Sequence, residues 1–404
     1  MSQQNIRVIN MAEEVLKIYS NGEVETALSK NEELRVYVKE NVQDPAIALE
    51  TVGDSYSKKQ SWELAKISYA YSIQTTMDHS RKNDEGPHAS FSVLQKYANV
   101  CMNLKDLTGA MRAFQKCLAI TRSRSLMEAG SDPTSAIALD PRIPDILSNI
   151  ARIQFEQGSI CGAIKVYKYC LTMQRTLSDR DVIAEANTMT ALGRIFRVVG
   201  RTEAAIEWHE EALELRAKLL GETHMSLAPD LLAIAKIHYR LEELDLSLAT
   251  FSDCLHILRS NPDSNTGLIS SILYNMGIIC SRLDDRSNAE GCFEEAIIAA
   301  RLIVDSDPAS RPIFAKSQYC LATIRQTQGR TSSAVKCVEE AIEYGLLEEN
   351  TDAFGTLTFL LQLYASFGDT IKVKYYSERI AELDQKEGNG GRRKKPRMHG
   401  ALAA

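Results

Sequence analysis

Residues 192–213, LGRIFRVVGRTEAAIEWHEEAL, contain the pattern that decides the fold. Gly193, Ala205 and Ala212 are small, larger apolar residues flank them at helical spacing, and Gly200 separates the two halves. Small residues recur wherever the chain repeats the position of Ala205, at Ala65, Ala110, Ala163, Ser247, Ala289 and Ala334. A pattern that returns in this way along a chain indicates a repeat architecture.

Three further columns of equivalent positions support the repeat. The position of Ala212 holds Ser72, Cys117, Cys170, Cys254, Ala296 and Ala341 in the other copies. Branched aliphatic residues follow it at Ile73, Leu118, Leu171, Leu213, Leu255, Ile297 and Ile342. A column on the preceding segment holds Ile153, Ile195, Ile237, Ile279 and Ile324. Because antiparallel helices approach closely only where small residues meet, we expect stacked helix pairs with about 14 to 18 residues per helix and buried cysteines.

The motifs Val52-Gly53-x-x-Tyr56 and Leu192-Gly193-x-x-Phe196, followed by the small and aromatic columns, resemble the tetratricopeptide repeat over roughly residues 46–385. The joint from Ala212-Leu213-Glu214-Leu215-Arg216 to Leu220-Gly221-x-x-His224 is similar to the longer, 42-residue repeats of kinesin light chains. The resemblance implies an all-α fold, a right-handed superhelical array of antiparallel helix pairs of the tetratricopeptide-type α-solenoid. It also implies a scaffold or adaptor that binds other proteins.

We expect three parts along the chain. Residues 1–44 form an N-terminal helical hairpin or cap, split by Asn21-Gly22, and residues 45–386 form about eight repeats. Pro and Gly residues near 123–144 indicate an inserted loop, and a second polar loop is expected from His79 to His88. Residues 387–404 are expected to be a disordered basic tail.

Charge and composition exclude several classes of function. The net charge is −6, but the last 18 residues carry +4, which leaves −10 on the rest. An acidic body is a poor general binder of nucleic acid, so such binding is expected only through the tail. The nine cysteines include no Cys-x-x-Cys pair, and no phosphate loop, HExxH or nucleophile elbow is present. We therefore expect no enzyme, no metal and no cofactor, no membrane span, and an intracellular, cytoplasmic protein.

The resemblance assigns a concave, ligand-binding groove to the first helix of each pair. At the groove positions this sequence supplies Asn149, Arg152, Phe155, Arg194, Arg197, Lys236, Tyr239, Arg240, Asn275 and Arg282. The cations would bind carboxylates, and the Asn149 and Asn275 amides would hydrogen bond to an extended peptide. We therefore expect an acidic peptide segment of a partner protein in a basic groove.

Other interpretations stay open at this point. The cations are also explained as ordinary exposed helix residues that pair with acids such as Glu156. A clamp for a C-terminal carboxylate is disfavoured, because Gln95, Asn187 and Ala191 stand where it needs cations. The chain is alternatively a structural subunit of a larger assembly that uses convex surfaces and edges. In the tail, a possible nuclear import signal or a solubilising end is formed by Arg392, Arg393, Lys394, Lys395 and Arg397. The partner and the oligomeric state do not follow from the sequence.

Overall fold

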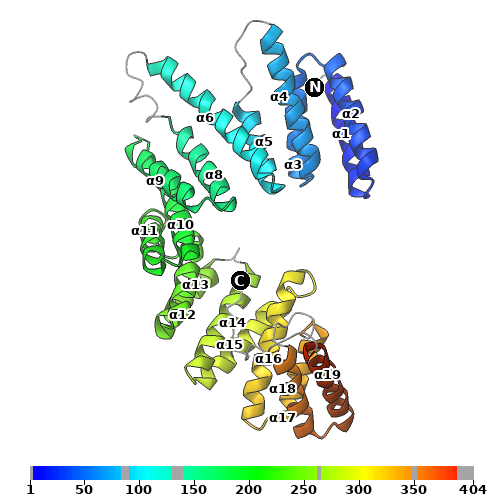
Figure 1. Cartoon of the computed structure of the whole chain (residues 1–404), viewed down its shortest axis with the longest axis vertical. Coiled ribbons are helices and arrows are strands. Elements are labelled where there is room, and N and C mark those ends of the chain that lie inside the picture. Colours follow the sequence, from blue (N-terminus) through cyan, green and yellow to red (C-terminus); the bar gives the residue numbers. More distant parts are fainter. Residues whose placement is uncertain are drawn as a thin grey trace. The chain divides into compact units, whose positions relative to one another are not determined.

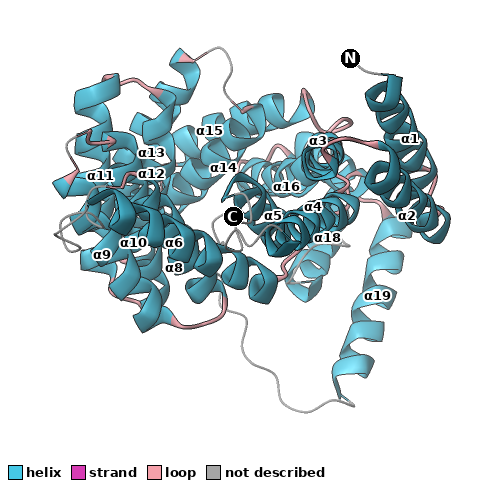
Figure 2. Cartoon of the chain, turned by 90° about the horizontal axis from the view of Figure 1, so that it is seen from above, coloured by secondary structure: helices cyan, strands magenta, loops and turns pink. Residues whose placement is uncertain are grey.

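The computed structural model describes residues 3–82, 91–129, 140–177, 179–261, 265–346 and 353–388. These residues form α-helices and two short 3₁₀ turns, and no strand occurs among them (Figures 1 and 2). Two compact units divide the chain, residues 1–199 and residues 200–404, and each is described by itself. The expected all-α stack of antiparallel helix pairs is confirmed.

Unit 1 consists of consecutive helices of which each packs against the next. Its helices are α1 (Gln3–Ser20), α2 (Val24–Asn41), α3 (Pro45–Lys58), α4 (Trp62–Lys82), α5 (Phe91–Asn103), α6 (Leu107–Ala129), α8 (Arg142–Glu156), α9 (Ile160–Thr176) and α10 (Val182–Val199). The closest pairs are α3 with α4, α8 with α9, α5 with α6, and α1 with α2. Val8, Ala12 and Val15 of α1 are buried in the same apolar cluster as Leu49 and Val52 of α3.

Unit 2 repeats the same arrangement. Its helices are α11 (Thr202–Leu220), α12 (Ala228–Arg240), α13 (Leu244–Ser260), α14 (Thr266–Arg282), α15 (Arg286–Arg301), α16 (Arg311–Thr327), α17 (Thr331–Glu343), α18 (Ala353–Phe367) and α19 (Thr370–Gly388). The 3₁₀ turns η1 (Met225–Leu227) and η2 (Pro308–Ser310) precede α12 and α16. One apolar cluster runs from Ala228 of α12 to Tyr376 of α19.

The small-residue columns lie in the core, as the sequence predicts. Ala65, Ala110, Ala163, Ala205, Ser247, Ala289 and Ala334 are all 0% exposed. The second column, which includes Cys117, Cys170 and Cys254, is buried as well. Its polar members donate to a carbonyl 26 residues earlier in the chain: Ser72 to Ala46, Cys117 to Phe91, Cys170 to Pro144 and Cys254 to Ala228. These bonds join the two helices of each pair.

Glycine is required where a helix pair is closest. A Cβ atom built on Gly53 would lie 2.6 Å from the Tyr69 ring, and one on Gly277 would lie 2.7 Å from the Phe293 ring. The turns between paired helices contain a residue in the left-handed backbone conformation. Gly200 adopts this conformation without strain, whereas Gln60 adopts it, with a φ of 57°, although it carries a side chain.

Two helices extend further than the sequence analysis expected. The helix α6 continues through Ser123 to Ala129, and α4 continues through His79 to Lys82. Thr121 and Ser125 are buried, and their hydroxyls donate to the carbonyls of Cys117 and Thr121. Burial of that face keeps α6 helical beyond residue 123. The expected loop near 123–144 is also wrong at its other end, because Arg142–Pro144 already belong to α8, and residues 387–388 of the expected tail belong to α19. Residues 83–90 and 130–139 of the expected loops and residues 389–404 of the expected tail lie outside the described residues.

Candidate protein-binding surface

Unit 1 presents three cations on two adjacent first helices, α8 and α10. Arg152 of α8 and Arg194 of α10 are exposed, and Arg197 of α10 is half-buried. The two helices contact each other. None of the three residues forms an ion pair with a carboxylate in the described part of the chain. We call Arg152, Arg194 and Arg197 the α8/α10 basic surface.

The cations point outward because the opposite faces of α8 and α10 are buried in the core. The buried face of α8 contains Ile143, Ile146 and Ile150, and that of α10 contains Leu192 and Ile195. Asn149 lies one turn before Arg152 and accepts from its Nη2 at 3.1 Å. Its own Nδ2 donates to the Asp145 carbonyl at 2.9 Å, so the amide fixes the guanidinium on the helix. Phe155, the other residue predicted on α8, is half-buried.

Tyr167 of α9 lies below this surface and is 4% exposed. Burial raises the pKa of Tyr167 to about 12, while the charges of Arg152 and Arg194 and a hydrogen bond with Ser148 act in the opposite direction.

The corresponding place on α3 and α5 is neutralised within the protein. Asp54 stands where α8 has Arg152, and the Tyr69 hydroxyl donates to Asp54 Oδ1 at 2.7 Å. Lys96 of α5 donates to Asp54 Oδ2 at 2.7 Å and to Glu50 Oε1 at 2.9 Å. Here the charges of Glu50, Asp54 and Lys96 compensate one another. Arg152, Arg194 and Arg197 have no such carboxylate partner in the described part of the chain.

Unit 2 corrects part of the expected groove. Asn275 is 0% exposed, so its amide is packed in the core and does not face a peptide. Arg282 lies 5.1 Å from the centre of the Tyr239 ring and pairs with Glu242, so its charge is compensated internally. Tyr239 is 8% exposed under this cover. Lys236 is half-buried and Arg240 is exposed on α12, and for both a binding role stays a prediction.

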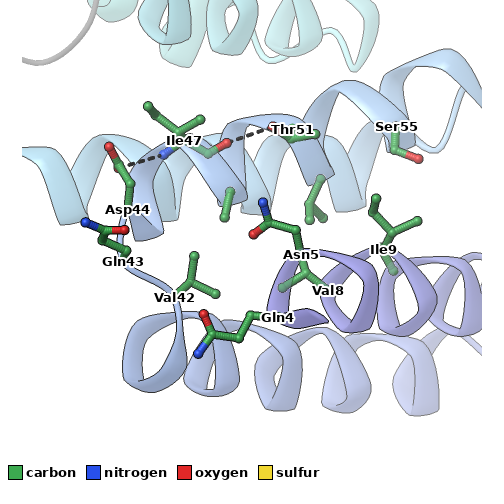
Figure 3. Close-up of a pocket in the computed structure, with 13 residues that line it drawn as sticks. Gln4, Asn5, Val8, Ile9, Val42, Gln43, Asp44, Ile47, Thr51 and Ser55 are labelled. Carbon is green, nitrogen blue, oxygen red and sulfur yellow. Dashed lines mark hydrogen bonds between the residues drawn. The ribbon is translucent and has the colours of Figure 1, made fainter. Parts of the chain in front are cut away.

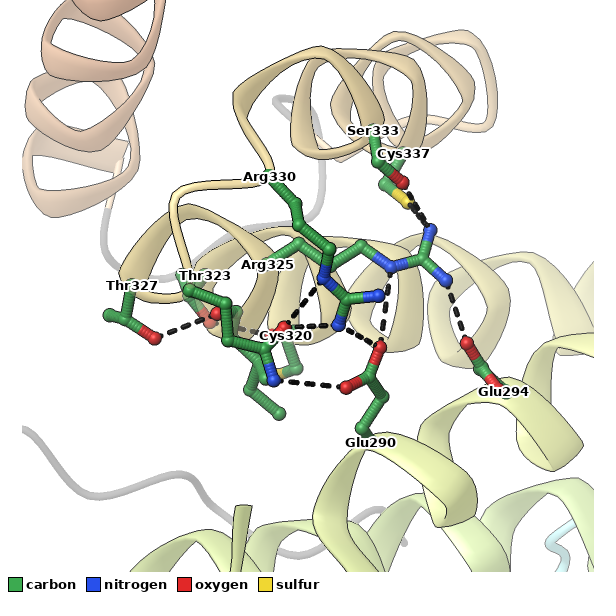
Figure 4. A network of polar contacts seen from close by, with 11 residues as sticks. Glu290, Glu294, Cys320, Thr323, Arg325, Thr327, Arg330, Ser333 and Cys337 are labelled. Carbon is green, nitrogen blue, oxygen red and sulfur yellow. Dashed lines mark hydrogen bonds and ion pairs between the residues drawn. The ribbon is translucent and has the colours of Figure 1, made fainter. Parts of the chain in front are cut away.

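Charge compensation continues on α15 and α16 (Figure 4). Arg325 donates to Glu294 at 2.7 Å and to Ser333 at 2.9 Å, and Arg330 pairs with Glu290. Burial alone would raise the pKa of Glu290, but the bonds from Arg330 and Gln328 hold it below its usual value. This network satisfies its own charges and offers none to a partner.

A buried polar cluster joins α11 to α12. His209 occupies the aromatic column, and its Nδ1 lies 2.7 Å from Asp230 Oδ1. Arg216 pairs with the other oxygen of Asp230. The three residues are 1%, 5% and 0% exposed in the order His209, Arg216, Asp230. His209 is therefore a core residue, and a buried carboxylate holds its imidazole.

A separate hollow lies between α1 and α3 (Figure 3). Val8, Ile9 and Ile47 give it apolar walls, and Gln4 and Gln43 lie at its rim. It shares no residue with the α8/α10 basic surface.

Among the described residues no group of three His, Cys, Asp or Glu side chains is placed to hold a metal ion. None of the described helices is long and apolar enough to cross a membrane. The expected import signal at Arg392–Arg397 lies outside the described residues.

Family models identify the repeats. Residues 142–218 and 184–260 match a model described as tetratricopeptide repeat, and residues 91–124 match another model of the same description. The chain therefore contains tetratricopeptide repeats in α5, α6 and from α8 to α13. No curated protein sequence matches the chain.

Solved structures with the same fold extend over nearly the whole chain. The apo form of RapI covers 95% of this chain and 99% of its own, with 13% identity and a TM-score of 0.52. A signal transduction ATPase with a tetratricopeptide repeat sensor, from Pyrococcus horikoshii, covers 96% of this chain and 58% of its own, with 14% identity and a TM-score of 0.56. At these identities the likeness shows the fold alone.

One further solved structure belongs to a protein with kinesin light chain-like repeats, the expected subclass. A putative kinesin light chain repeat protein from Podosopora anserina covers 52% of this chain and 99% of its own, with 13% identity and a TM-score of 0.41. This score does not bear on the resemblance to the longer repeats, which stays a prediction.

Proposed function

We propose that this chain is a non-catalytic protein-interaction scaffold whose α8/α10 basic surface binds an acidic segment of a partner protein. Proteins built from tetratricopeptide repeats are generally interaction scaffolds. The observation that supports the acidic ligand is that Arg152, Arg194 and Arg197 have no carboxylate partner among the described residues. Guanidiniums that are accessible in this way can bind carboxylates through paired N–H groups.

Charge reversal on this surface tests the proposal. We expect Arg152→Glu, Arg194→Glu and Arg197→Glu, combined in one variant, to abolish capture of the protein's partners from a lysate. Each lost charge-assisted contact is worth about 1.5–3 kcal/mol, and each new carboxylate adds repulsion. Capture by the parent protein should also weaken steeply as salt is raised, because exposed charges are screened.

A matched control exists on α6 of the same unit. Arg112, Lys116 and Arg122 are exposed, and changing all three to Glu alters the net charge by the same amount. Circular dichroism first establishes that both variants are folded. If the α8/α10 variant retains every partner that the parent captures, or if the α6 variant loses them equally, the acidic-ligand proposal is wrong.

Exposed apolar residues favour the alternative, a structural subunit of a larger assembly. Ile298 of α15 is 64% exposed, and Leu302, which caps the C-terminal end of α15, is 76% exposed. On α19, Ile371 is 82% exposed and Tyr375 is 51% exposed. Large apolar interfaces persist in high salt. Partners that remain bound after high-salt washes and are lost on Leu302→Asp and Ile371→Asp would support this alternative.

A further inference from the structure

The hollow between α1 and α3 is lined mainly by apolar side chains and has a volume of about 510 Å³ (Figure 3). Val8, Ala12 and Val52 line it and are buried in the apolar cluster of these helices. Ile9 and Ile47 also line it, yet they are 36% and 61% exposed. The apolar surface therefore continues from the inside of the hollow to the outside of the protein.

The next two first helices, α3 and α5, are bridged by polar side chains. Glu50 of α3 accepts from Ser92 Oγ at 3.2 Å and from Lys96 Nζ at 2.9 Å, and both donors belong to α5. Lys96 also donates to Asp54 of α3 at 2.7 Å. Acids of one helix are thus joined to a hydroxyl and an amine of the next.

The hollow lies where α1 and α3 lack this bridge. The repeats align on the left-handed residue two positions before each second helix, which is Gly22, Gln60 or Lys105. On this alignment Ala12 takes the place of the acid that accepts both bonds, and Ile47 and Thr51 take the places of the hydroxyl and the amine. The Thr51 hydroxyl donates to the Ile47 carbonyl at 2.9 Å, so its proton is used within α3. Small and apolar side chains therefore stand where the bridge would cross.

The charges around the hollow favour an uncharged ligand. Among the described residues that line it, none is Lys, Arg or His, and Asp44 is the one acid. Asp44 Oδ1 accepts from the Ile47 backbone N–H at 3.3 Å and so caps α3. A ligand carboxylate would meet this acid and find no cation in the lining. The exposed amides of Gln4 and Gln43 offer donors and acceptors to a neutral polar group.

The exposed isoleucines favour a peptide over a small molecule. A molecule contained within the hollow would leave Ile47 as exposed as it is now. A peptide that crosses the opening would cover Ile9 and Ile47, place a side chain inside, and present its backbone to the Gln4 and Gln43 amides.

We propose that the α1/α3 hollow binds an uncharged peptide segment of a partner protein, which inserts one large aliphatic or aromatic side chain. This contact goes beyond the proposed function, because its chemistry is apolar and it shares no residue with the α8/α10 basic surface. The chain would then have two separate peptide-binding surfaces in unit 1.

A phage-displayed library of random peptides, selected on the full chain, tests the inference. The recovered peptides are synthesised and their affinities are measured. We expect one class of peptides to share a large apolar residue without neighbouring acids, and its replacement by alanine to weaken binding about tenfold or more. Because the contact is apolar, the affinity of this class should change less than about twofold when salt is raised.

Substitutions in the hollow identify where this class binds. Ile47→Asp places a charge at the opening and Ala48→Phe fills the hollow, so each should weaken binding about tenfold or more. Val36→Asp, at a 44% exposed valine of α2 outside the hollow, is the matched control and should have no effect. Circular dichroism first establishes that the variants are folded. Thr51→Lys combined with Ala12→Glu copies the bridge of α3 and α5 and should also abolish binding.

The outcomes separate this inference from the proposed function. If no peptide is recovered, or if every recovered peptide binds the Ile47→Asp and Ala48→Phe variants as tightly as the parent, the α1/α3 site is wrong. The α8/α10 proposal is unaffected by that result, because its own charge-reversal variant keeps the hollow intact. The neutral dye N-phenyl-1-naphthylamine is the remaining probe. If this dye binds the parent and not Ala48→Phe while no peptide depends on the hollow, the site takes small molecules and the peptide proposal is overturned.

Discussion

The buried cluster of His209, Arg216 and Asp230 gives a direct test of the packing in unit 2. The repeat that follows has Phe251, Leu258 and Ile272 at the equivalent positions, all of them buried in one apolar cluster. We therefore compare Asp230→Asn, which breaks the polar cluster, with a triple variant that replaces it by the apolar residues of the next repeat: His209→Phe, Arg216→Leu and Asp230→Ile.

The magnitudes follow from burial. Asp230 is 0% exposed and accepts from His209 at 2.7 Å and from Arg216. Asp230→Asn breaks the buried ion pair with Arg216, a change that typically costs about 3–5 kcal/mol. Replacing a whole buried ionic cluster by apolar residues of matching shape is often neutral or stabilising by about 1–4 kcal/mol. The single change should therefore cost more than the triple change.

Urea denaturation followed by circular dichroism measures both effects. The control is Asp253→Asn, an exposed acid on α13, which should change the free energy of unfolding by less than about 0.5 kcal/mol. If Asp230→Asn costs less than about 1 kcal/mol, the carboxylate does not hold Arg216. If the triple variant is less stable than Asp230→Asn, the apolar columns of α11 and α12 are not interchangeable with those of the next repeat.

Two further predictions concern the helix pairs. Ala205 is 0% exposed, so Ala205→Leu should destabilise the protein by about 1–3 kcal/mol through overpacking. The same urea titration measures this loss, and an unchanged unfolding midpoint would contradict close packing at Ala205. Gln60 has a left-handed φ of 57°, a conformation that glycine adopts with less strain. Gln60→Gly should therefore raise the free energy of unfolding by about 0.5–1 kcal/mol. A lower melting temperature of the variant would show that the Gln60 side chain stabilises the turn.

The sequence predicts the core better than the surface because the repeat averages over many copies. A small residue at one position is weak evidence, but Ala65, Ala205 and Ala334 with their equivalents share one column, and all are buried. The ends of helices lack this redundancy. Ser123 was expected in a loop because prolines follow it, whereas burial of Thr121 and Ser125 extends α6 by another turn.

The columns of equivalent positions do not predict which side chains form ion pairs or hydrogen bonds with one another. Column positions place Arg152 and Arg282 alike on first helices. Arg282 pairs with Glu242, whereas no carboxylate of the described residues pairs with Arg152. Glu242 comes from a turn 40 residues earlier, and its approach depends on three-dimensional packing. Asn275 failed as a groove residue for the same reason, because complete burial of its face of α14 was not visible in the sequence.

The repeats differ in whether the charged residues on their surface helices form ion pairs with one another. The buried columns fold every helix pair in the same way, so first-helix surface positions are free to differ between repeats. At Asp54, Lys96 and Glu50 the differing residues neutralise one another across α3 and α5. At Arg325, Glu294 and Glu290 they do so across α15 and α16.

On α8 and α10 the same positions carry cations without acids among the described residues. Arg152 and Arg194 are exposed, so water solvates both charges and the free protein bears little cost for them. The wall charges on α3 and α5 already form ion pairs within the protein, and a ligand carboxylate would have to displace them. A carboxylate that binds Arg152 and Arg194 displaces no acid among the described residues, which is the physical reason to look for the ligand at this surface first.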